Sequence, residues 1–523
     1  MDFLTTDSAR TVTELLERTL ARRTAEEEGG ARGLPPAIVV DAGAGGEAQI
    51  LTYARLCALS GALARRLVRA GVAPGTRVAV VAGRSAWQAI AAVAILRAGA
   101  VYVPVDRDNP AARIEWLLGD CAPAAVLYDA PAGLDVPALT LAPSLNLGDP
   151  AIREDLAAEA EALGGEVTPA RPVTGDDPVY VIYTSGTTGT PKGAINLHRG
   201  VAHHLGWMAE AFGGEGHTVL NKAPVSFDVG VAEMLSPLAS GGTVVIPPPD
   251  WWPGDSLALA EMVARHEVTV MSLVPSMMRA LLDAGPRPGA LSALRHLLLG
   301  GEAVAADLVS RVREVTPARI HGLYGPSETA MDVMWVEYTP EVPLRPGQCL
   351  LGLPEPGVGL RVIDPETSER VRPGEVGELV IAGVQVGGGY FRRPELTAAA
   401  FLDDPEAGRM YRTGDLVRFD EELGMYEFRG RIGEQVKVRG NRVELGEVEA
   451  TLLGAPGVTG AACLLVGEEL WGYVTGEVDP DRVRAHLRGV LPGYAVPGRL
   501  VRLERLPLGR NGKLDKSALP QQR

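Results

Sequence analysis

Aromatic side chains, cysteines and long apolar runs are all scarce in this sequence of 523 residues. Phe, Trp and Tyr together make up 5% of the chain. The four cysteines, Cys57, Cys121, Cys349 and Cys463, are too far apart for a zinc motif, so buried free thiols are expected. Arg97 interrupts the best candidate for a membrane span, which excludes a transmembrane helix there.

Positive charge is also in the minority. The chain has 50 Lys and Arg against 65 Asp and Glu, a net charge of −15, which argues against general binding to nucleic acids or membrane surfaces. The first residues, MDFLTTDSAR, lack the basic region and apolar core of a secretion signal, so a cytoplasmic protein is expected. A hydrophobic content of 46% and the length predict a globular chain with several domains or subdomains.

Between residues 50 and about 330, short apolar strands alternate with helices. RVAVVA (77–82), AVYVPV (100–105) and LRHLLLGG (294–301) are expected to be buried strands, and residues 85–98 a helix. This rhythm predicts an α/β core of two doubly wound subdomains, with parallel sheets covered on both faces. Ligands of such sheets bind beyond the carboxyl ends of the strands.

The pattern changes twice in the second half of the chain. Residues 340–428 hold short alternating segments between glycine- and proline-rich turns, which favours a small β-barrel or distorted sheet. Residues 434–523 hold two short strand regions, a helix near 480–491 and a basic end, which favours a small α+β domain.

The run YTSGTTGTPKG (183–193) follows the apolar strand VYVI. Its glycines allow close approach of the backbone to a ligand, and its amides, hydroxyls and lysine suit a polyphosphate. The sequence is not a P-loop, which needs Gly-Lys followed by Ser or Thr. A flexible linker is the competing interpretation, but linkers seldom begin with an apolar strand.

Ten ordered blocks along the chain carry a family resemblance. They are LTYARL (51–56), LRAGAVYVPVD (96–106), YTSGTTGTPKG (183–193), FDVGVAEM (227–234), GLYGPSET (322–329), GELVIAGVQVGGGY (377–390), YRTGDL (411–416), GRIGEQVKVRGNRVELGEVE (430–449), LPGYAVP (491–497) and NGKLDK (511–516). The chain resembles amino-acid adenylation domains of nonribosomal peptide synthetases, in the superfamily shared with acyl-CoA synthetases and luciferases. The resemblance implies a core over 1–430, a mobile C-terminal domain over 434–523 and a hinge near 431–434.

The chemistry implied by the resemblance is attack of an amino-acid carboxylate on the α-phosphate of ATP, then transfer of the acyl group to a carrier-protein thiol. Lys513 matches the catalytic lysine, and Glu328 matches the residue that helps to hold Mg²⁺. A solvated lysine in a basic tail is the alternative for Lys513. The remaining ATP-binding positions implied by the resemblance are Thr184, Ser185, Gly186, Thr187, Thr188, Lys192, Gly301, Glu302, Gly322, Tyr324, Ser327, Asp415 and Arg431.

Several of these positions have implied partners on ATP. Tyr324 would stack on the adenine, Ser327 would contact the α-phosphate, and Asp415 would accept hydrogen bonds from the ribose hydroxyls with Arg431 nearby. Asp415 could instead cap its turn. Lys192 would reach the pyrophosphate.

Two further positions bear on substrate and motion. Asp228 matches the carboxylate that pairs with the α-ammonium of an amino acid, and acyl-CoA synthetases and luciferases have no such ammonium to bind. Gly433 stands where the family has a charged hinge residue; its conformational freedom should still permit rotation of the C-terminal domain.

Carried over by resemblance, the amino-acid pocket consists of Asp228, Val229, Ala232, Ser272, Leu298, Gly300, Leu323, Met331, Asp332 and Lys513. Small residues at Ala232, Ser272 and Gly300 predict a deep pocket. A carboxylate at Asp332 favours a polar or basic substrate of arginine or ornithine type, with a serine- or glutamine-like substrate as the alternative.

Other functions stay open at this point. An acid–CoA ligase is one competing class, and Asp228 argues against it. A catalytically silent nucleotide-binding scaffold is the other, and the presence of Lys513 and Glu328 argues against it. ATP and Mg²⁺ are the implied cofactors, and a phosphopantetheinylated carrier protein is the implied partner. The sequence leaves open an MbtH-like partner, the oligomeric state, and whether the enzyme is free-standing or part of a larger synthetase.

Overall fold

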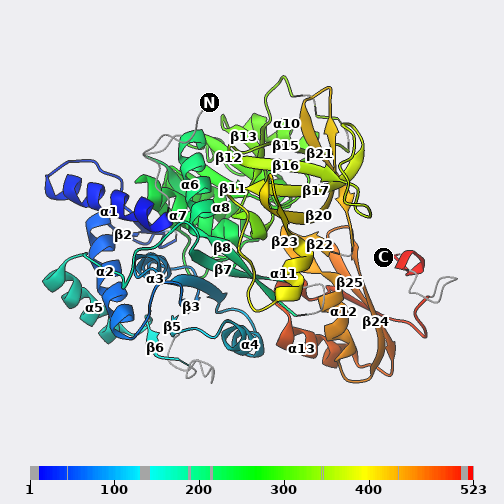
Figure 1. Cartoon of the computed structure of the whole chain (residues 1–523), viewed down its shortest axis with the longest axis horizontal. Helices are drawn as coiled ribbons and strands as arrows, with labels where there is room; N and C mark the ends of the chain where they lie inside the picture. Colours follow the sequence, from blue (N-terminus) through cyan, green and yellow to red (C-terminus); the bar gives the residue numbers. More distant parts are fainter. Residues whose placement is uncertain are drawn as a thin grey trace.

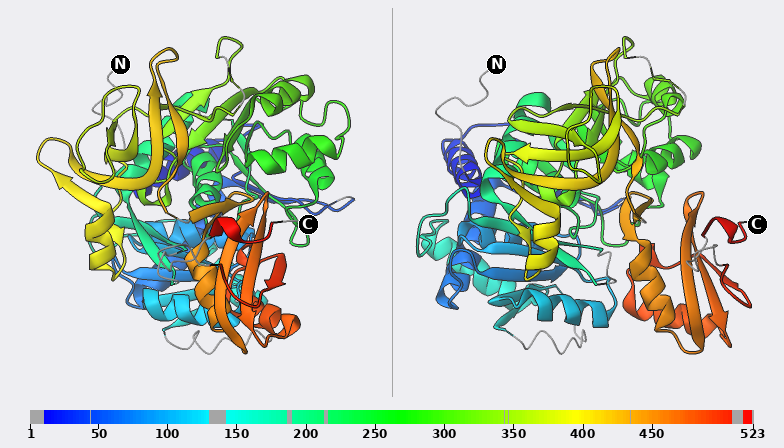
Figure 2. Two further views of the ribbon diagram at one scale, coloured as in Figure 1. Left: turned by 90° about the vertical axis from the view of Figure 1, so that its right-hand side faces the viewer. Right: turned by 45° about the vertical axis from the view of Figure 1, so that its right-hand side comes forward.

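The structure is a computed structural model. It describes residues 11–43, 45–129, 142–185, 190–212, 216–342, 344–345, 347–433, 435–507 and 516–521. Two large sheets with their helices form a core, and a smaller lobe of residues 435–507 and 516–521 lies beside it (Figures 1 and 2).

The first sheet has the strand order β18-β8-β7-β4-β3-β5-β6. Its strands are β3 Arg77–Ala82, β4 Val101–Asp106, β5 Ala125–Tyr128, β6 Ser144–Asn146, β7 Pro178–Thr184, β8 Lys192–Leu197 and β18 Gly389–Tyr390. Strands β3 to β7 are parallel, whereas β8 and β18 are antiparallel additions at one edge. The buried apolar runs of β3, β4 and β7 are typical of parallel strands covered on both faces.

The second sheet is a path of thirteen strands with one strand, β19, attached to β20. Its parallel part comprises β1 Ile38–Val40, β9 Thr218–Leu220, β10 Thr243–Ile246, β11 Val270–Leu273, β12 His296–Gly300 and β13 Arg319–Tyr324, with β2 Gln49–Leu51 antiparallel at the edge. Its antiparallel part comprises β14 Met334–Glu337, β15 Leu350–Pro354, β16 Val358–Ile363, β17 Val376–Gly383, β19 Phe401–Asp404, β20 Gly408–Asp420 and β21 Met425–Arg431. The antiparallel segments expected over 340–428 are therefore continuous with the second parallel sheet through β14 and β15.

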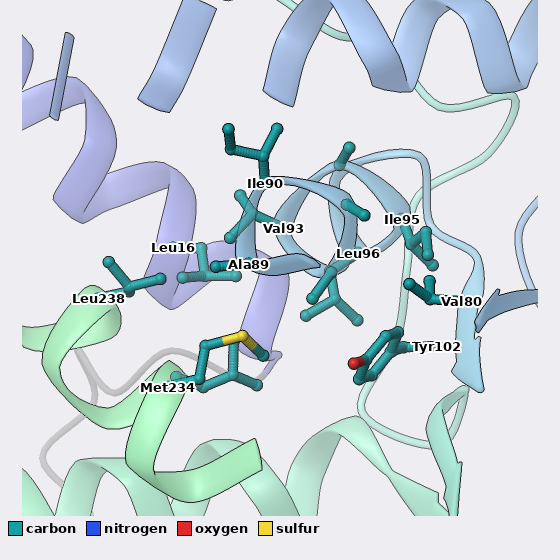
Figure 3. Close-up of a cluster of buried hydrophobic side chains, with 14 of the residues drawn as sticks. Leu16, Val80, Ala89, Ile90, Val93, Ile95, Leu96, Tyr102, Met234 and Leu238 are labelled. Carbon is teal, nitrogen blue, oxygen red and sulfur yellow. The ribbon is translucent and has the colours of Figure 1, made fainter. Parts of the chain in front are cut away.

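Helices cover and join the two sheets. They are α1 Val12–Glu28, α2 Tyr53–Arg69, α3 Ala86–Arg97, α4 Ala111–Cys121, α5 Pro150–Leu163, α6 His198–Phe212, α7 Asp228–Ser240, α8 Ser256–Arg265, α9 Pro275–Asp283, α10 Ala306–Val315 and α11 Pro394–Ala400. Helix α3 is almost wholly buried, because its sequence AWQAIAAVAILR is apolar on every face. Figure 3 shows its side chains between Leu16 of α1, Leu238 of α7 and Tyr102 of β4.

The smaller lobe has an α+β fold with a core of its own. It contains β22 Gln435–Val438, β23 Asn441–Glu444, α12 Leu445–Leu453, β24 Val458–Val466, β25 Glu469–Gly476, α13 Pro480–Val490, β26 Arg499–Arg502 and the short η3 Gly493–Ala495 and η4 Lys516–Ala518. Its core is centred on Val448, Leu452 and Leu487 of α12 and α13.

Some elements were not anticipated from the sequence. Helix α12 is one of these, because it is only nine residues long, follows a strand directly and lacks a side-chain hydrogen bond at its N-cap. Helix α1 is another; a capping box between Thr11 and Glu14 begins it.

The expectation of free cysteines is confirmed for all four. Cys121 and Cys463 are buried, whereas Cys57 and Cys349 are partly exposed. Among the described helices, none combines the length and apolar character that crossing a bilayer requires.

Candidate active site

The site is built where strand ends of the two sheets face each other. Strand β7 ends at Thr184, just before the glycine-rich run, and β8 begins at Lys192, which pairs with Thr184 in the hairpin. Strand β13 ends at Tyr324 and leads into the short η2 turn, Ser327–Thr329. Carboxyl ends of strands in open α/β sheets are the usual positions for ligands.

Glu328 of η2 is the centre of a buried charged cluster. Its Oε1 lies 3.3 Å from Nζ of Lys192 and accepts a hydrogen bond of 2.7 Å from the hydroxyl of Tyr390. Its Oε2 accepts a hydrogen bond of 2.9 Å from Arg442. The Lys192 ammonium also donates to the Tyr390 hydroxyl at 2.8 Å and lies over the Tyr390 ring.

This cluster keeps Glu328 ionised. Burial alone would raise the pKa of Glu328, but the positive charges of Arg442 and Lys192 and the hydrogen bond from Tyr390 hold that pKa well below its usual range. Burial lowers the pKa of Lys192, and the charge of Glu328 opposes that shift. The cluster therefore presents a fixed carboxylate and two cations to one small volume.

One cation of the cluster comes from the smaller lobe. Arg442 lies on β23, and its main-chain carbonyl accepts a hydrogen bond of 3.0 Å from the Ser185 hydroxyl. Gly440, with φ of +78°, packs against Val274; a Cβ at Gly440 would lie 2.2 Å from that side chain. The β22–β23 hairpin thus closes over the core at the charged cluster, and a glycine is required at its tip.

A second cluster joins the end of β13 to the antiparallel part of the second sheet. The Tyr324 hydroxyl donates to Oδ2 of Asp415 at 2.5 Å, and Arg431 lies 3.0 Å from Oδ1 of Asp415. Asp415 and Arg431 are paired residues of β20 and β21, so the sheet register itself brings them together. Burial, followed by the charge of Asp415, raises the pKa of Tyr324 well above its usual value, which keeps its hydroxyl a donor.

Asp228 begins helix α7, at its N-terminus. Its carboxylate accepts hydrogen bonds from the main-chain amide of Val229 and from the hydroxyl of Ser327, the neighbour of Glu328. Burial raises the pKa of Asp228 despite these bonds. The side chain is partly exposed although deeply set, and none of the ion pairs among the described residues involves it.

The remaining pocket positions predicted by resemblance lie on neighbouring elements. In the parallel register of β11, β12 and β13, Ser272 is paired with Leu298, and Gly300 is paired with Leu323. Ala232 lies one helical turn after Asp228 on α7 and shares a hydrophobic cluster with Met331. Val229 is more exposed than the others, at 37%.

The backbone is strained just before Asp332. Ala330 and Met331 have φ angles of +55° and +78°, in the left-handed region, which costs about 1–3 kcal/mol for each residue without compensation. The turn packs against Gly325, where a Cβ would lie 1.9 Å from the Met331 carbonyl oxygen. Such outliers persist only where surrounding contacts hold them.

Asp332 differs from Glu328 in its surroundings. Burial, above all, raises the pKa of Asp332 to about 7; Glu355 and Asp228 add to the rise, and His204 and Lys437 oppose it. Within the part of the chain that the structure describes, no ion pair is made by Asp332. A partly exposed carboxyl without a protein cation can accept one from a ligand.

Glycine and acidic positions next to the site have evident local roles. Gly301 has φ of +81°, and Glu302 accepts two hydrogen bonds from Ser276 at the start of α9. A Cβ at Gly322 would lie 2.5 Å from the Tyr338 hydroxyl, so close packing alone demands glycine there. Gly433 has φ of +93° and open space around it.

Four predicted residues lie outside the described residues: Lys513, Gly186, Thr187 and Thr188. Thr184 is buried, and its hydroxyl has no hydrogen-bond partner among the residues described. Conversely, Tyr390 and Arg442 belong to the charged cluster without having been predicted. Both lie in sequence blocks that carry the resemblance, GELVIAGVQVGGGY and GRIGEQVKVRGNRVELGEVE, and membership of those blocks is the signal that could have found them.

Comparison with known proteins follows the same division of the chain. Residues 28–391 match the family model for AMP-binding enzymes, and residues 447–513 match the model for the AMP-binding enzyme C-terminal domain. Tyrocidine synthase 3 of Brevibacillus parabrevis is 36% identical over 486 residues, which are 91% of this chain and 7% of that protein. Enterobactin synthase component F of Escherichia coli (strain K12) is 36% identical over 485 residues, 88% of this chain and 36% of that protein.

A solved structure gives the same picture. Holo-PA1221, a nonribosomal peptide synthetase protein containing adenylation and PCP domains and bound to a vinylsulfonamide inhibitor, is 26% identical, with a TM-score of 0.79. The match covers 97% of this chain and 83% of that one. The chain spans well under two thirds of the length of the two synthetases named above.

Proposed function

Because this chain belongs to the family of AMP-binding enzymes, as an adenylation domain of the nonribosomal peptide synthetase type, we propose that it activates an α-amino acid with ATP and passes it to a carrier-protein thiol. In the first step the substrate carboxylate oxygen forms a bond to the α-phosphorus. The bond from that phosphorus to the bridging oxygen breaks, and pyrophosphate leaves with the electron pair. In the second step the carrier thiolate attacks the acyl carbon and AMP leaves; the thiol proton is lost to a base or to solvent.

One observation carries this proposal: the η2 turn joins the amino-acid end of the site to the phosphate end. Ser327 donates to Asp228, and the next residue, Glu328, is paired with Lys192. A substrate whose ammonium lies at Asp228 would have its carboxylate near the charged cluster. Positioning and charge stabilisation of this kind are the main catalytic contributions in phosphoryl transfer.

The donor set at Glu328 fits Mg²⁺. A metal held by protein side chains alone is not supported, because the described residues include no group of three His, Cys, Asp or Glu that could hold one. Mg²⁺ commonly uses one or two carboxylates together with substrate phosphates and water, and Glu328 is an ionised carboxylate beside the glycine-rich run. When bound, the metal would neutralise charge on the phosphates; Arg442, which bonds Oε2 of Glu328 in this domain arrangement, would have to leave that oxygen.

We further propose roles for the residues around ATP. Tyr324 would stack on the adenine, and Asp415 with Arg431 would bind the ribose. Ser327 would contact the α-phosphate and Lys192 the departing pyrophosphate. Lys513 would bridge the substrate carboxylate and the α-phosphate, carried there by rotation of the smaller lobe about residues 431–434.

The amino acid itself is proposed to have a polar or basic side chain, of arginine or ornithine type, with serine- or glutamine-like substrates as the alternative. The support is Asp332, a deeply set carboxyl that no cation of the described residues pairs with. Leaving an ionised carboxylate unpaired in such a position is unfavourable, and a cationic substrate side chain would supply the partner.

A pyrophosphate-exchange panel with the common amino acids, ornithine and arginine tests reaction class and substrate together. We expect exchange that depends on ATP and is strongest with a basic amino acid. Replacing Lys513 with alanine should abolish exchange while leaving the thermal unfolding midpoint unchanged. Exchange with no amino acid at all, or an active Lys513→Ala variant, would contradict the proposal.

The acceptor is tested separately. Loaded with the preferred amino acid, the enzyme should transfer it to a phosphopantetheinylated carrier protein far faster than to free coenzyme A. Preference for coenzyme A, together with activity on carboxylic acids that lack an ammonium, would favour an acid–CoA ligase instead.

A further inference from the structure

A chain of buried polar side chains lies behind the strained turn of the amino-acid pocket. Gln385, which follows β17, is 1% exposed. Its amide nitrogen donates to the main-chain carbonyl of Asp332 at 2.7 Å and reaches that of Ala330 at 3.4 Å. One side chain therefore donates hydrogen bonds to two main-chain carbonyls of the turn.

The chain continues away from the pocket. Glu355, which follows β15, is 1% exposed, and its carboxyl lies beside the Gln385 side chain. Its two carboxyl oxygens lie 3.2 and 3.3 Å from Nδ1 of His204 on α6. His204 is wholly buried and packs on Trp207, with ring centroids 5.6 Å apart. The network is thus anchored to a helix and to two strand ends that come from distant parts of the sequence.

The turn needs such an anchor. Ala330 and Met331 both adopt left-handed conformations, which L-residues with a Cβ rarely occupy. The amide of Ala330 is held by Oδ1 of the buried Asn196 at 2.9 Å, which satisfies one donor. The carbonyls of Ala330 and Asp332 need donors as well, and an amide with two N–H groups is a side chain that can serve both.

We propose that His204, Glu355 and Gln385 are positioning residues that hold the Ala330–Met331 turn and thereby set which amino-acid side chain the pocket accepts. The inference rests on the proposed function, because it is that function which makes Met331 and Asp332 part of an amino-acid pocket. Gln385 contacts the turn through the main-chain carbonyls of Ala330 and Asp332, so the three side chains act through the turn.

The geometry also explains why the network is polar. An apolar side chain at position 385 would fill the same space, yet it would leave the main-chain carbonyls of Ala330 and Asp332 without this hydrogen-bond donor. Relaxation of the turn would then move the Asp332 carboxyl relative to Asp228. Since Asp228 fixes the ammonium, such a movement changes the distance available to the substrate side chain.

Gln385→Met tests the proposal, because methionine has a similar length and no donor. We expect kcat/KM for the preferred amino acid in pyrophosphate exchange to fall by about tenfold to a hundredfold, mostly through KM. KM for ATP should stay within about twofold, since the Glu328 and Asp415 clusters do not contact Gln385. Other amino acids should lose less, so that the selectivity ratio falls.

Gln348→Met is the matched control. Gln348 is also a buried glutamine with side-chain hydrogen bonds, to Asp420 and to the amide of Arg345, but it lies outside the pocket. It should lower the unfolding midpoint without changing the selectivity ratio. A Gln385→Met enzyme whose losses are equal for every amino acid, or whose ratio is that of the wild type, overturns the proposal.

Glu355→Gln serves if Gln385→Met fails to fold. It keeps the size of the side chain and a hydrogen bond with His204, while it replaces the carboxyl beside Gln385 with an amide. The ratio should shift in the same direction by a smaller factor, and an unchanged ratio in a folded Glu355→Gln enzyme also overturns the proposal. Failure of the proposed function would look different: the wild type itself would show no exchange dependent on an amino acid.

Discussion

The two ends of the site neutralise their acidic side chains in opposite ways. At the proposed phosphate end, Glu328 is completely buried and already paired with Lys192 and Arg442. At the proposed amino-acid end, Asp228 and Asp332 keep some exposure and make no ion pair within the described part of the chain. The pKa of Glu328 is consequently lowered, whereas the pKa values of both aspartates are raised.

This contrast indicates what each end is prepared to bind. A carboxylate with cations already beside it belongs to a prearranged electrostatic site, which can exchange one cation for another. Carboxyls that are desolvated and unpaired store unfavourable energy until a ligand brings positive charge. An amino acid with a cationic side chain would bring two such charges, one for each aspartate.

The largest effect is expected from breaking the paired end. Glu328→Gln removes the charge that Lys192 and Arg442 share and the oxygen ligand proposed for Mg²⁺. We expect the rate of pyrophosphate exchange to fall by about a thousandfold, as for loss of a preorganised electrostatic contact. Steady-state exchange at saturating amino acid and ATP measures the effect.

Stability must be separated from catalysis in this variant, because two cations that are only slightly exposed, Lys192 and Arg442, lose their partner. Such losses commonly amount to about 3–5 kcal/mol. Glu427→Gln provides the comparison: Glu427 is 2% exposed and lies between Arg418 and Arg429 at 2.8 and 2.9 Å. We expect both variants to lose a similar amount of unfolding free energy, while Glu427→Gln keeps full exchange activity. That result would show that the loss of activity in Glu328→Gln comes from the missing contacts of Glu328 and not from lower stability.

A smaller effect is expected at the ammonium position. Asp228→Asn should raise KM for the amino acid by about a hundredfold and leave KM for ATP unchanged, because a charged hydrogen bond is replaced by a neutral one. The desamino analogue of the preferred substrate sharpens the result. The wild type should discriminate strongly against the analogue, and Asp228→Asn should not; equal discrimination by both enzymes would remove the role assigned to Asp228.

How much of this site could be predicted from the sequence depends on the kind of contact. Tyr324 and Glu328 lie in a short motif at the end of β13, and Asp415 lies in another short motif within β20. The structure brings each of them to a cluster with another predicted residue, Arg431 or Lys192. The alternation of apolar strands and helices likewise predicted the parallel sheets. In both cases the information is local in the sequence.

Contacts between distant segments were not predictable in this way. Arg442 reaches Glu328 across 114 positions, and His204 reaches Glu355 across 151. Nothing in the neighbouring residues of His204 or Gln385 indicates a buried polar partner, because the pattern around them is that of an ordinary helix and an ordinary strand end. The short helix α12 was missed for a related reason, since its stability comes from packing on β24 and α13.

The smallest effect is expected at Asp332, where the change is one of preference. Asp332→Asn should lower kcat/KM for a basic amino acid by about tenfold, the scale of a partly exposed charge pair, and should leave glutamine within about threefold. The exchange panel measures both values on the same preparation. An equal loss of kcat/KM for basic and neutral amino acids would mean that Asp332 does not distinguish between substrate side chains.

The pH dependence gives the sharpest test of the unpaired end. With a pKa of about 7, Asp332 is mostly protonated at pH 6 and mostly ionised at pH 8, so kcat/KM for a basic amino acid should rise by about tenfold over that interval. The rise should vanish in Asp332→Asn and with glutamine as substrate.

The folded pKa lies above the unfolded one, so Asp332 makes the free energy of unfolding fall as pH rises from about 4 to about 7. Asp332→Asn should therefore gain stability over the wild type at pH 8 and not at pH 4, and denaturant unfolding at the two pH values measures this. A difference between variant and wild type that is equal at both pH values would show that folding does not raise the pKa of Asp332.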